Sequence, residues 1–181
     1  ITAGPTIEKI DPIRIITNNS SGKTGLALAN EAKRRGANVT LIYGEGREIP
    51  STSIRTIRIS SSQQLLDVTV DELSKTKYDF YIASAAPSDF KIISPSSEKI
   101  SSRDNKSLNV ELEAYPKIIN FVKQLSPSTK LIAFKALYDP NKTTSSNAIS
   151  EIFNDSHADF IIVNDVSRKD AGFSSDYNEL T

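Results

Sequence analysis

The sequence contains no cysteine, no methionine and no tryptophan, and only one histidine among its 181 residues. The absence of cysteine excludes a disulfide framework, a thiolate nucleophile and a cysteine-based zinc site. The single histidine, His157, lies in the polar stretch "NDSHAD", where no motif places a carboxylate or a serine beside it. We therefore expect His157 to be a surface residue at a helix end, and a histidine-based catalytic triad or zinc site has little support.

The chain also lacks an excess of either charge and any long apolar run. It carries 22 lysines and arginines against 22 aspartates and glutamates, so its net charge gives no reason to expect binding to nucleic acid or to a membrane surface. No apolar run approaches the roughly 20 residues of a membrane span, and no signal-peptide pattern opens the chain. We expect a cytoplasmic protein without nucleic-acid or membrane partners, in which an anionic ligand needs a local site.

Length and composition predict a single globular domain over residues 1–181. Apolar residues make up 38% of the chain and charged residues 24%. The chain opens at Ile1-Thr2-Ala3-Gly4 without an initiator methionine, as if a strand had been cut part-way, and its polar end at 174–181 looks like the approach to another strand. We expect the sequence to be a piece of a longer chain, truncated at both ends.

Short apolar runs rich in β-branched and aromatic residues predict strands buried on both faces of a parallel sheet. These runs lie at 38–44, 78–85, 130–136 and 159–165. Helical patterns alternate with them at Ser21–Arg35, Gln63–Lys75, Pro116–Leu125 and Thr144–Phe153. The run at 53–60 mixes isoleucine with arginine and indicates an edge strand. This alternation predicts an α/β domain, namely a Rossmann-like three-layer fold around a parallel sheet.

One stretch, at about 90–113, breaks the alternation of strands and helices. Two short extended pieces there flank the polar sequence "SSRDNKS". We expect a β-hairpin arm that projects from the sheet and covers a site or a partner subunit.

Ligands of open α/β sheets bind beyond the carboxyl ends of the strands, where the strand order reverses. The residues that follow each predicted strand are therefore the candidates for a binding site. These segments are 4–23, 83–99, 134–138 and 164–176.

The stretch "TNNSSGKTG", residues 17–25, looks like a phosphate-binding P-loop but does not match the motif. The P-loop motif has its first glycine where this chain has Thr17. A helix that starts at Ser20 or Ser21 would still direct free backbone N–H groups and a positive dipole end at an anion. The alternative is an ordinary helix with a serine cap, which assigns no packing or binding role to the polar side chains of Asn18 and Asn19.

A carboxylate follows small residues in "ASAAPSDFK", residues 83–91. Small side chains let a ligand approach the backbone, and Asp89 could then bind a base, a ribose or Mg²⁺. The alternative is a crowded turn in which Asp89 caps the loop.

An NAD(P)-dependent reductase is the rival interpretation of the fold. Its fingerprint needs three spaced glycines after the first strand, and residues 2–11 supply only Gly4. Tyr138 and Lys142 match a Tyr-x-x-x-Lys pair, but Pro140 between them disfavours a shared helix. The motifs for this function are therefore weak.

Five stretches together resemble one family, the phosphopantothenate-cysteine ligases (phosphopantothenoylcysteine synthetases) of coenzyme A biosynthesis, in an archaeal-like form. The stretches are "ITAGPT", "DPIRIITNNSSGKTG", "ASAAPSDF", "EKI" and "NDVSRKDAGFSSDYNE". The resemblance spans nearly the whole chain. Its most specific part is the order of Asp-Pro-x-Arg, an asparagine and Ser-Ser-Gly-Lys-x-Gly, and the motif near the end of the chain is nearly as specific.

The resemblance implies a reaction in two halves. The carboxylate of 4′-phosphopantothenate attacks the α-phosphate of CTP to give an acyl-cytidylate and pyrophosphate, and the amine of L-cysteine then displaces CMP. Neither half needs an enzyme nucleophile, but both need positioning and charge cancellation, with Mg²⁺. In bacteria and archaea the family is commonly fused to a flavin-dependent decarboxylase, so FMN belongs to a domain that this chain lacks. A non-catalytic nucleotide-binding homologue is a further alternative.

The family pattern also implies roles for individual residues of this chain. Asn18 and Lys99 are expected to be catalytic, with Asn18 donating to the acyl group and Lys99 reaching the triphosphate, and Asp89 is expected to contact Mg²⁺. The residues expected to bind phosphopantothenate are Arg14, Asn18, Ser20 and Lys23. Those expected to bind the nucleotide are Ser21, Gly22, Ala85, Ala86, Asp89, Lys99, Ala114, Tyr115, Pro116, Lys117 and Phe134.

The chain departs from the bacterial pattern at the nucleotide site. Residues 114–117 read Ala-Tyr-Pro-Lys instead of Lys-Asn-Pro-Asp. Two lysines that contact the nucleotide in the bacterial pattern align near Ile152 and Ser156, so this chain lacks them. The nucleotide is therefore open between CTP, which we expect, and ATP, which eukaryotic members can use. Family members are dimers in which the arm of one subunit closes over the other's site, so we expect a homodimer.

Overall fold

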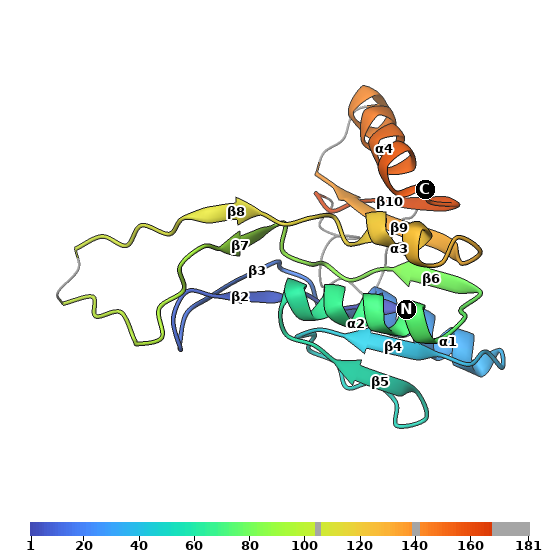
Figure 1. The fold of residues 1–181 in the computed structure, drawn as a ribbon, viewed down its shortest axis with the longest axis horizontal. Helices are drawn as coiled ribbons and strands as arrows, with labels where there is room; N and C mark the ends of the chain where they lie inside the picture. Colours follow the sequence, from blue (N-terminus) through green and yellow to red (C-terminus); the bar gives the residue numbers. More distant parts are fainter. Residues whose placement is uncertain (104–105, 139–141, 168–181) are drawn as a thin grey trace.

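The computed structural model describes residues 1–103, 106–138 and 142–167, and a six-stranded parallel sheet forms its centre. The strands lie in the order β10-β9-β6-β1-β4-β5. Their bounds are β1 Thr2–Ala3, β4 Thr40–Tyr43, β5 Arg55–Arg58, β6 Phe80–Ala83, β9 Lys130–Leu137 and β10 Phe160–Asp165. The predicted buried strands are confirmed, and β5, which carries the arginines, lies at the edge as expected (Figure 1).

The order of the strands reverses between β1 and β6. Counted along the chain, the six strands follow the 3-2-1-4-5-6 order of the doubly wound dinucleotide-binding fold. Thr2 of β1 pairs with Ala83 of β6, and beyond the two strands the pairing continues through a bridge between Pro5 and Ala86. The crevice expected for a ligand therefore lies beyond the carboxyl ends of β1 and β6.

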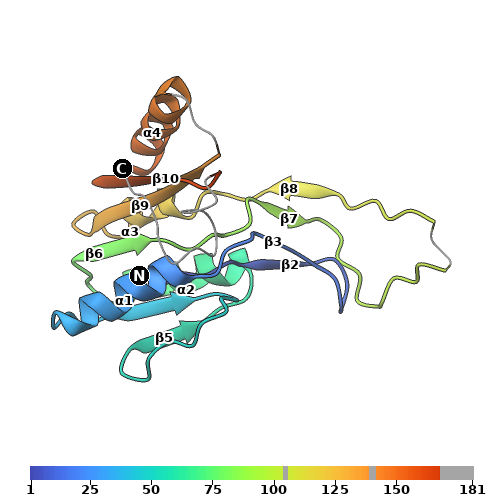
Figure 2. The ribbon, with the colours of Figure 1, turned by 180° about the vertical axis from the view of Figure 1, so that it is seen from behind.

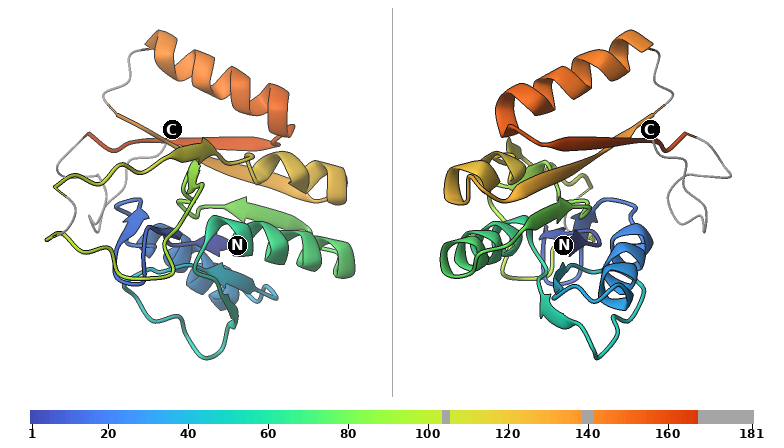
Figure 3. Two further views of the ribbon diagram at one scale, coloured as in Figure 1. Left: turned by 60° about the vertical axis from the view of Figure 1, so that its left-hand side comes forward. Right: turned by 90° about the vertical axis from the view of Figure 1, so that its right-hand side faces the viewer.

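Helices cover both faces of the sheet, which confirms the three-layer Rossmann-like prediction (Figure 3). Helix α1, Lys23–Arg34, lies on one face, while α2, Ser62–Lys75, and α3, Ile119–Leu125, lie on the other. Helix α4, Lys142–Ser156, packs beside α3. None of the helices in the described part of the chain is long and apolar enough to cross a bilayer.

Three consecutive residues of β4 show how the core is shared between the layers. Leu41 and Tyr43 pack in the cluster that contains Leu26 of α1, whereas Ile42 between them packs against Leu65 of α2. Side chains alternate between the faces of a strand, so a strand covered on both sides must be apolar at every position. This is the pattern from which the strand was predicted.

Two antiparallel hairpins stand outside the main sheet. In the arm, β7 (Phe90–Ile92) pairs with β8 (Leu112–Ala114), and the described residues between these strands extend away from the sheet as predicted (Figures 1 and 2). A second hairpin, β2 (Ile7–Lys9) with β3 (Ile15–Thr17), was not predicted. Strands of three residues are too short to show a clear hydrophobic period.

The helix starts differ from their predicted positions. Helix α1 begins at Lys23 rather than at Ser20 or Ser21, because Gly22 takes φ 80°, a left-handed conformation that a helix cannot include. Helix α3 begins at Ile119, and Pro116 lies outside it, since Asn120 N–H bonds to the Lys117 carbonyl in a tight turn. Helix α4 is longer than predicted, and the exposed His157 follows it, which confirms its expected place at a helix end.

Candidate active site

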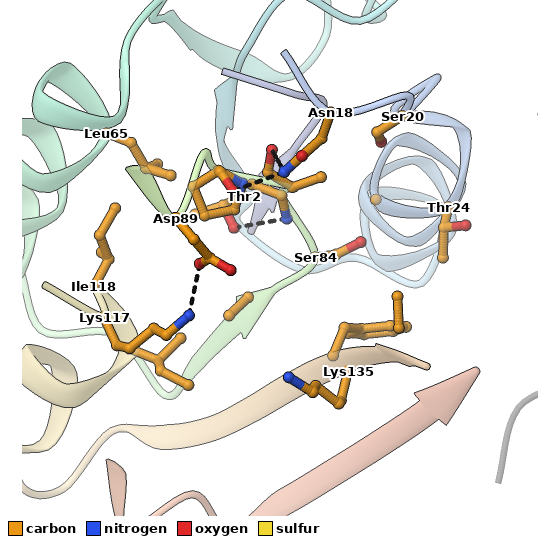
Figure 4. A pocket seen from close by; sticks show the side chains of 18 of the residues that line it. Thr2, Asn18, Ser20, Thr24, Leu65, Ser84, Asp89, Lys117, Ile118 and Lys135 are labelled. Carbon is orange, nitrogen blue, oxygen red and sulfur yellow. Dashed lines mark hydrogen bonds and ion pairs between the residues drawn. The ribbon is translucent and has the colours of Figure 1, made fainter. Parts of the chain in front are cut away.

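A cavity of about 490 Å³ lies at the reversal of the strand order. Its walls come from the residues that follow β3 and β6, from the last residues of β9 and β10, from the first turn of α1, from the start of α3 and from one side of α4. Ten of the predicted binding residues line it: Asn18, Ser20, Ser21, Gly22, Lys23, Ala85, Ala86, Asp89, Lys117 and Phe134. Figure 4 shows several of these side chains directed toward a common space. Parts of all four candidate segments thus line the cavity, together with residues of the strands and helices themselves.

The start of α1 forms one end of this cavity. The hydroxyl of Ser20 accepts a hydrogen bond from Gly22 N–H, and that of Ser21 accepts one from Lys23 N–H, both at 3.4 Å. The first turn of the helix, from Lys23, lines the cavity, so the positive end of the helix dipole faces it. Backbone N–H groups and this dipole suit a phosphate or a carboxylate.

Close packing of α1 on β1 depends on Gly25, the last glycine of the Ser-Ser-Gly-Lys-x-Gly motif, which was not among the predicted site residues. A Cβ added at Gly25 would overlap the Cβ of Ala3 and would lie 3.1 Å from the hydroxyl of Ser84. Glycine therefore allows the helix start to reach the carboxyl ends of β1 and β6. The third glycine of a dinucleotide-binding fingerprint has the same packing function, so a glycine just inside the first helix was a usable signal.

The amide of Asn18 is held by the protein itself. Its Nδ2 donates to the carbonyl of Ala86 at 3.3 Å and to that of Pro87 at 2.8 Å. We expected this amide nitrogen to donate to an acyl oxygen, but in this conformation both of its hydrogens are engaged. The carbonyl oxygen is the atom that Asn18 can offer to a ligand while keeping these two bonds.

An ion pair between Asp89 and Lys117 stands on the opposite wall of the cavity, with Nζ and Oδ1 2.6 Å apart (Figure 4). Both side chains are more than half exposed, so the pair contributes little to stability. No group of three histidine, aspartate or glutamate side chains suited to a metal occurs among the described residues. A single carboxylate fits a Mg²⁺ ion that is held mainly by substrate phosphates, provided that Lys117 moves aside.

Asn120, Lys135, Glu151 and Asp155 are among the polar residues that line the cavity without having been assigned to the predicted site. Lys135 follows the predicted Phe134 on β9, and Figure 4 shows its side chain reaching into the cavity. Ile152 also lines the cavity, whereas Ser156 is buried and donates to the Ile152 carbonyl. Of the two positions that carry lysines in the bacterial pattern, one is therefore apolar and the other is buried away from the cavity. Glu151 and Asp155 make the wall formed by α4 acidic.

The remaining predicted residues lie outside the cavity. Arg14 pairs with Asp11, and Lys99 is exposed on the arm. Ala114 ends β8, and Tyr115 donates through its hydroxyl to Gln63. The exposed Pro116 is likewise absent from the cavity wall. A role for any of these in catalysis or binding stays a prediction.

The residues of the reductase alternative lie at the edge of the described structure. Tyr138 is 79% exposed at the end of β9, and Lys142 is the first residue of α4. Pro140 lies outside the described residues. No feature of the cavity favours a nicotinamide over another nucleotide.

Comparison with known proteins identifies the family. The model of the DNA/pantothenate metabolism flavoprotein C-terminal domain matches residues 1–181. The chain belongs to this family. A curated relative, the coenzyme A biosynthesis bifunctional protein CoaBC of Thermococcus kodakarensis, is 38% identical over 180 residues, which are 99% of this chain and 43% of the relative. The chain thus spans less than half of that protein's length.

Two solved structures agree with the family membership. The DNA/pantothenate metabolism flavoprotein from Streptococcus pneumoniae superimposes with a TM-score of 0.81 at 28% identity, over 92% of this chain and 81% of that one. The C-terminal domain of a coenzyme A biosynthesis bifunctional protein CoaBC gives a TM-score of 0.74 at 29% identity, over 99% and 82% of the two chains. The resemblance drawn from the sequence motifs is therefore confirmed for the family and the fold.

Proposed function

We propose that this domain is a phosphopantothenate-cysteine ligase, which joins 4′-phosphopantothenate to L-cysteine in coenzyme A biosynthesis. The observation that carries the proposal is the convergence of Asn18, the Ser20–Lys23 turn and Asp89 on one cavity at the reversal of the strand order. These residues come from separate motifs of the family that the chain belongs to. The name of the Thermococcus relative, a coenzyme A biosynthesis protein, supports the same pathway.

In the first half-reaction, a carboxylate oxygen of phosphopantothenate bonds to the α-phosphorus of the nucleotide, and the bond to the pyrophosphate oxygen breaks. The reactants carry several negative charges, so the protein must neutralise and align them. The start of α1 with Lys23 serves one phosphate group, and Lys117 and Lys135 supply cations on the opposite wall. Asp89 would hold a Mg²⁺ ion bound to the nucleotide phosphates, and this ion would supply further neutralisation.

In the second half-reaction, the amine of cysteine attacks the acyl carbon and the nucleoside monophosphate leaves. The amine loses a proton as the amide forms, and a phosphate oxygen of the leaving nucleoside monophosphate takes it up. The free oxygen of the Asn18 amide is an acceptor for the N–H of this amine, held in place by the two bonds to Ala86 and Pro87. Asn18 would thus act on the second step and leave the first largely unaffected.

The nucleotide we propose is CTP, with ATP as a weaker substitute. Glu151 and Asp155 line the cavity on the α4 side, and carboxylates accept hydrogen bonds from exocyclic amino groups such as that of cytosine. Cytosine and adenine carry such a group, whereas uracil presents only carbonyl oxygens and a ring N–H.

Product formation with each nucleotide tests the function and the base preference together. In the full-length protein with Mg²⁺, phosphopantothenate and cysteine, we expect phosphopantothenoylcysteine to form fastest with CTP, more slowly with ATP, and at least about tenfold more slowly with UTP. Absence of product with both CTP and ATP would overturn the ligase, whereas tight CTP binding without turnover would indicate a non-catalytic homologue. Equal rates with UTP and CTP would overturn the base assignment alone.

A second copy of the chain is the partner we propose for the arm. Exposed apolar side chains gather on the arm and on the hairpin beside it: Ile13, Ile15, Phe90, Ile93, Leu108 and Leu112. Several exposed apolar side chains in one region of the molecule are typical of a protein interface. A flavin-dependent decarboxylase with FMN, fused to the domain or associated with it, is the other partner we propose, since the relative is named as bifunctional.

Substitutions of Ile93 and Leu108 by aspartate test the dimer. Together they should raise the dissociation constant of the dimer by at least about tenfold, because two charges would be buried without partners. Sedimentation velocity over a range of concentrations measures this constant. Ile49→Asp is the matched control, since Ile49 is 88% exposed and lies outside the arm. An unchanged constant in the double variant would contradict an interface formed by the arm.

A further inference from the structure

The buried carboxylate of Asp11 joins two segments that are far apart in the sequence. Asp11 lies in the turn between β2 and β3, and its side chain is 0% exposed. Its Oδ1 accepts hydrogen bonds from the backbone N–H groups of Ile13 at 2.9 Å and Arg14 at 2.7 Å, which closes its own turn. Its Oδ2 pairs with the guanidinium of Arg14 and accepts a further backbone hydrogen bond, at 3.2 Å, from Ile100 of the arm.

Two more hydrogen bonds hold the arm on this turn. Arg14 Nη1 donates to the carbonyl of Ile100 at 3.1 Å, and Ser96 N–H donates to the carbonyl of Ile10 at 2.8 Å. Ile100 therefore both donates and accepts on the Asp11–Arg14 pair. We call these five residues, Ile10, Asp11, Arg14, Ser96 and Ile100, the arm latch.

The surroundings of Asp11 stabilise the ionised form of its carboxyl group. Burial alone would raise the pKa of the Asp11 carboxyl, but the backbone hydrogen bonds from Ile13, Ile100 and Arg14 and the Arg14 side chain together lower it to about 2. Asp11 is therefore ionised at neutral pH. A buried carboxylate that loses these partners raises the free energy of the protein. The arm latch therefore favours the arrangement in which the arm stays bound to the β2–β3 turn.

We propose that Asp11 is a positioning residue that sets the place of the arm, and with it Lys99, relative to the β2–β3 hairpin. Lys99 immediately precedes Ile100 in the arm, while β3 leads directly from Arg14 to Asn18. One buried carboxylate thus fixes both segments. Asp11 does not line the cavity and acts only through other residues. The part of this proposal that concerns Lys99 rests on the proposed ligase function. The arm latch gives Arg14 a role in holding the arm rather than in binding phosphopantothenate.

Amide hydrogen exchange tests the arm latch itself, without reference to activity. In the full-length protein, the amides of Ser96 and Ile100 should exchange slowly, because both are hydrogen-bonded to the β2–β3 turn. Asp11→Asn should speed exchange at Ile100, whereas Glu31→Gln, which breaks an exposed ion pair on α1, should leave it unchanged. Fast exchange at Ile100 in the wild type would overturn the proposal, and this result does not depend on the variant folding.

A double-mutant cycle tests whether Asp11 acts through Lys99. We expect Asp11→Asn to lower kcat for pyrophosphate release by about tenfold or more, with KM for the nucleotide little changed, because misplacement of a catalytic group by about 1 Å is costly. In a Lys99→Ala background the same change should have almost no further effect. Losses that multiply in the double variant would overturn the proposal. If the wild type releases no pyrophosphate, the ligase function fails, while the exchange experiment still decides on the arm latch.

Discussion

Replacing Asn18 by alanine is expected to leave pyrophosphate release close to the wild-type rate and to reduce amide formation by roughly 10²-fold or more. The first half-reaction depends on the phosphate-binding groups at the start of α1 and on the cations of the cavity, which this change does not touch. The second depends on an acceptor for the amine, and the Asn18 oxygen is held for that purpose by the bonds to Ala86 and Pro87.

The two rates are measured separately, pyrophosphate by a coupled assay without cysteine and product by mass spectrometry with cysteine. Asn30→Ala provides the matched control, because it makes the same change on an exposed position of α1 outside the cavity. Equal losses in both half-reactions for Asn18→Ala would contradict the role assigned to its amide.

Replacing Gly25 by alanine should weaken nucleotide binding by about tenfold or more, which corresponds to about 1.4 kcal/mol. In an exposed helix this change would stabilise the protein by up to about 1 kcal/mol, since alanine favours helix. Here the added Cβ would overlap the Cβ of Ala3 and approach Ser84, and overpacking of this kind costs about 1 to 3 kcal/mol. The cost of overpacking therefore exceeds the gain in helix propensity, and the start of α1 must shift from its position beside the cavity.

Calorimetric titration gives the nucleotide affinity, and urea unfolding gives the stability. Gly36→Ala is the control: Gly36 has φ +90°, so a side chain costs about 1 to 2 kcal/mol there, but nothing lies within 4 Å and the affinity should not change. Adding Ala3→Gly to Gly25→Ala should recover part of the lost affinity. Wild-type affinity in the Gly25→Ala protein would show that close packing of α1 on β1 is unimportant for binding.

The sequence was sufficient to predict the main sheet because its strands are buried on both faces. Leu41, Ile42 and Tyr43 must all be apolar when helices cover both sides of β4, and this continuous run is visible without a structure. The start of α1 was not predictable to the residue. Ser20 and Ser21 are good helix caps, but Gly22 takes the left-handed conformation, so the helix begins only after it.

The cavity residues that the sequence predicted lie at or after the ends of strands. Residues whose place depends on how a helix is turned, or on a contact with a distant part of the chain, were not predictable. Asp89 follows β6, Phe134 lies near the carboxyl end of β9, and Asn18 lies in the segment between β1 and α1, so all three fall beside the carboxyl edge of the main sheet. Glu151, by contrast, faces the cavity only because of the way α4 is turned. Arg14 contacts Ile100, 86 positions away in the sequence, and no local pattern reveals such a contact.

Pyrophosphate release in the absence of cysteine shows whether the cavity activates a carboxylate by nucleotidyl transfer. The full-length protein is incubated with Mg²⁺ and CTP, with and without 4′-phosphopantothenate. We expect pyrophosphate only when both substrates are present, together with an acyl-cytidylate that added cysteine converts to product. No pyrophosphate with CTP or with ATP, or the same amount without phosphopantothenate, would contradict this prediction.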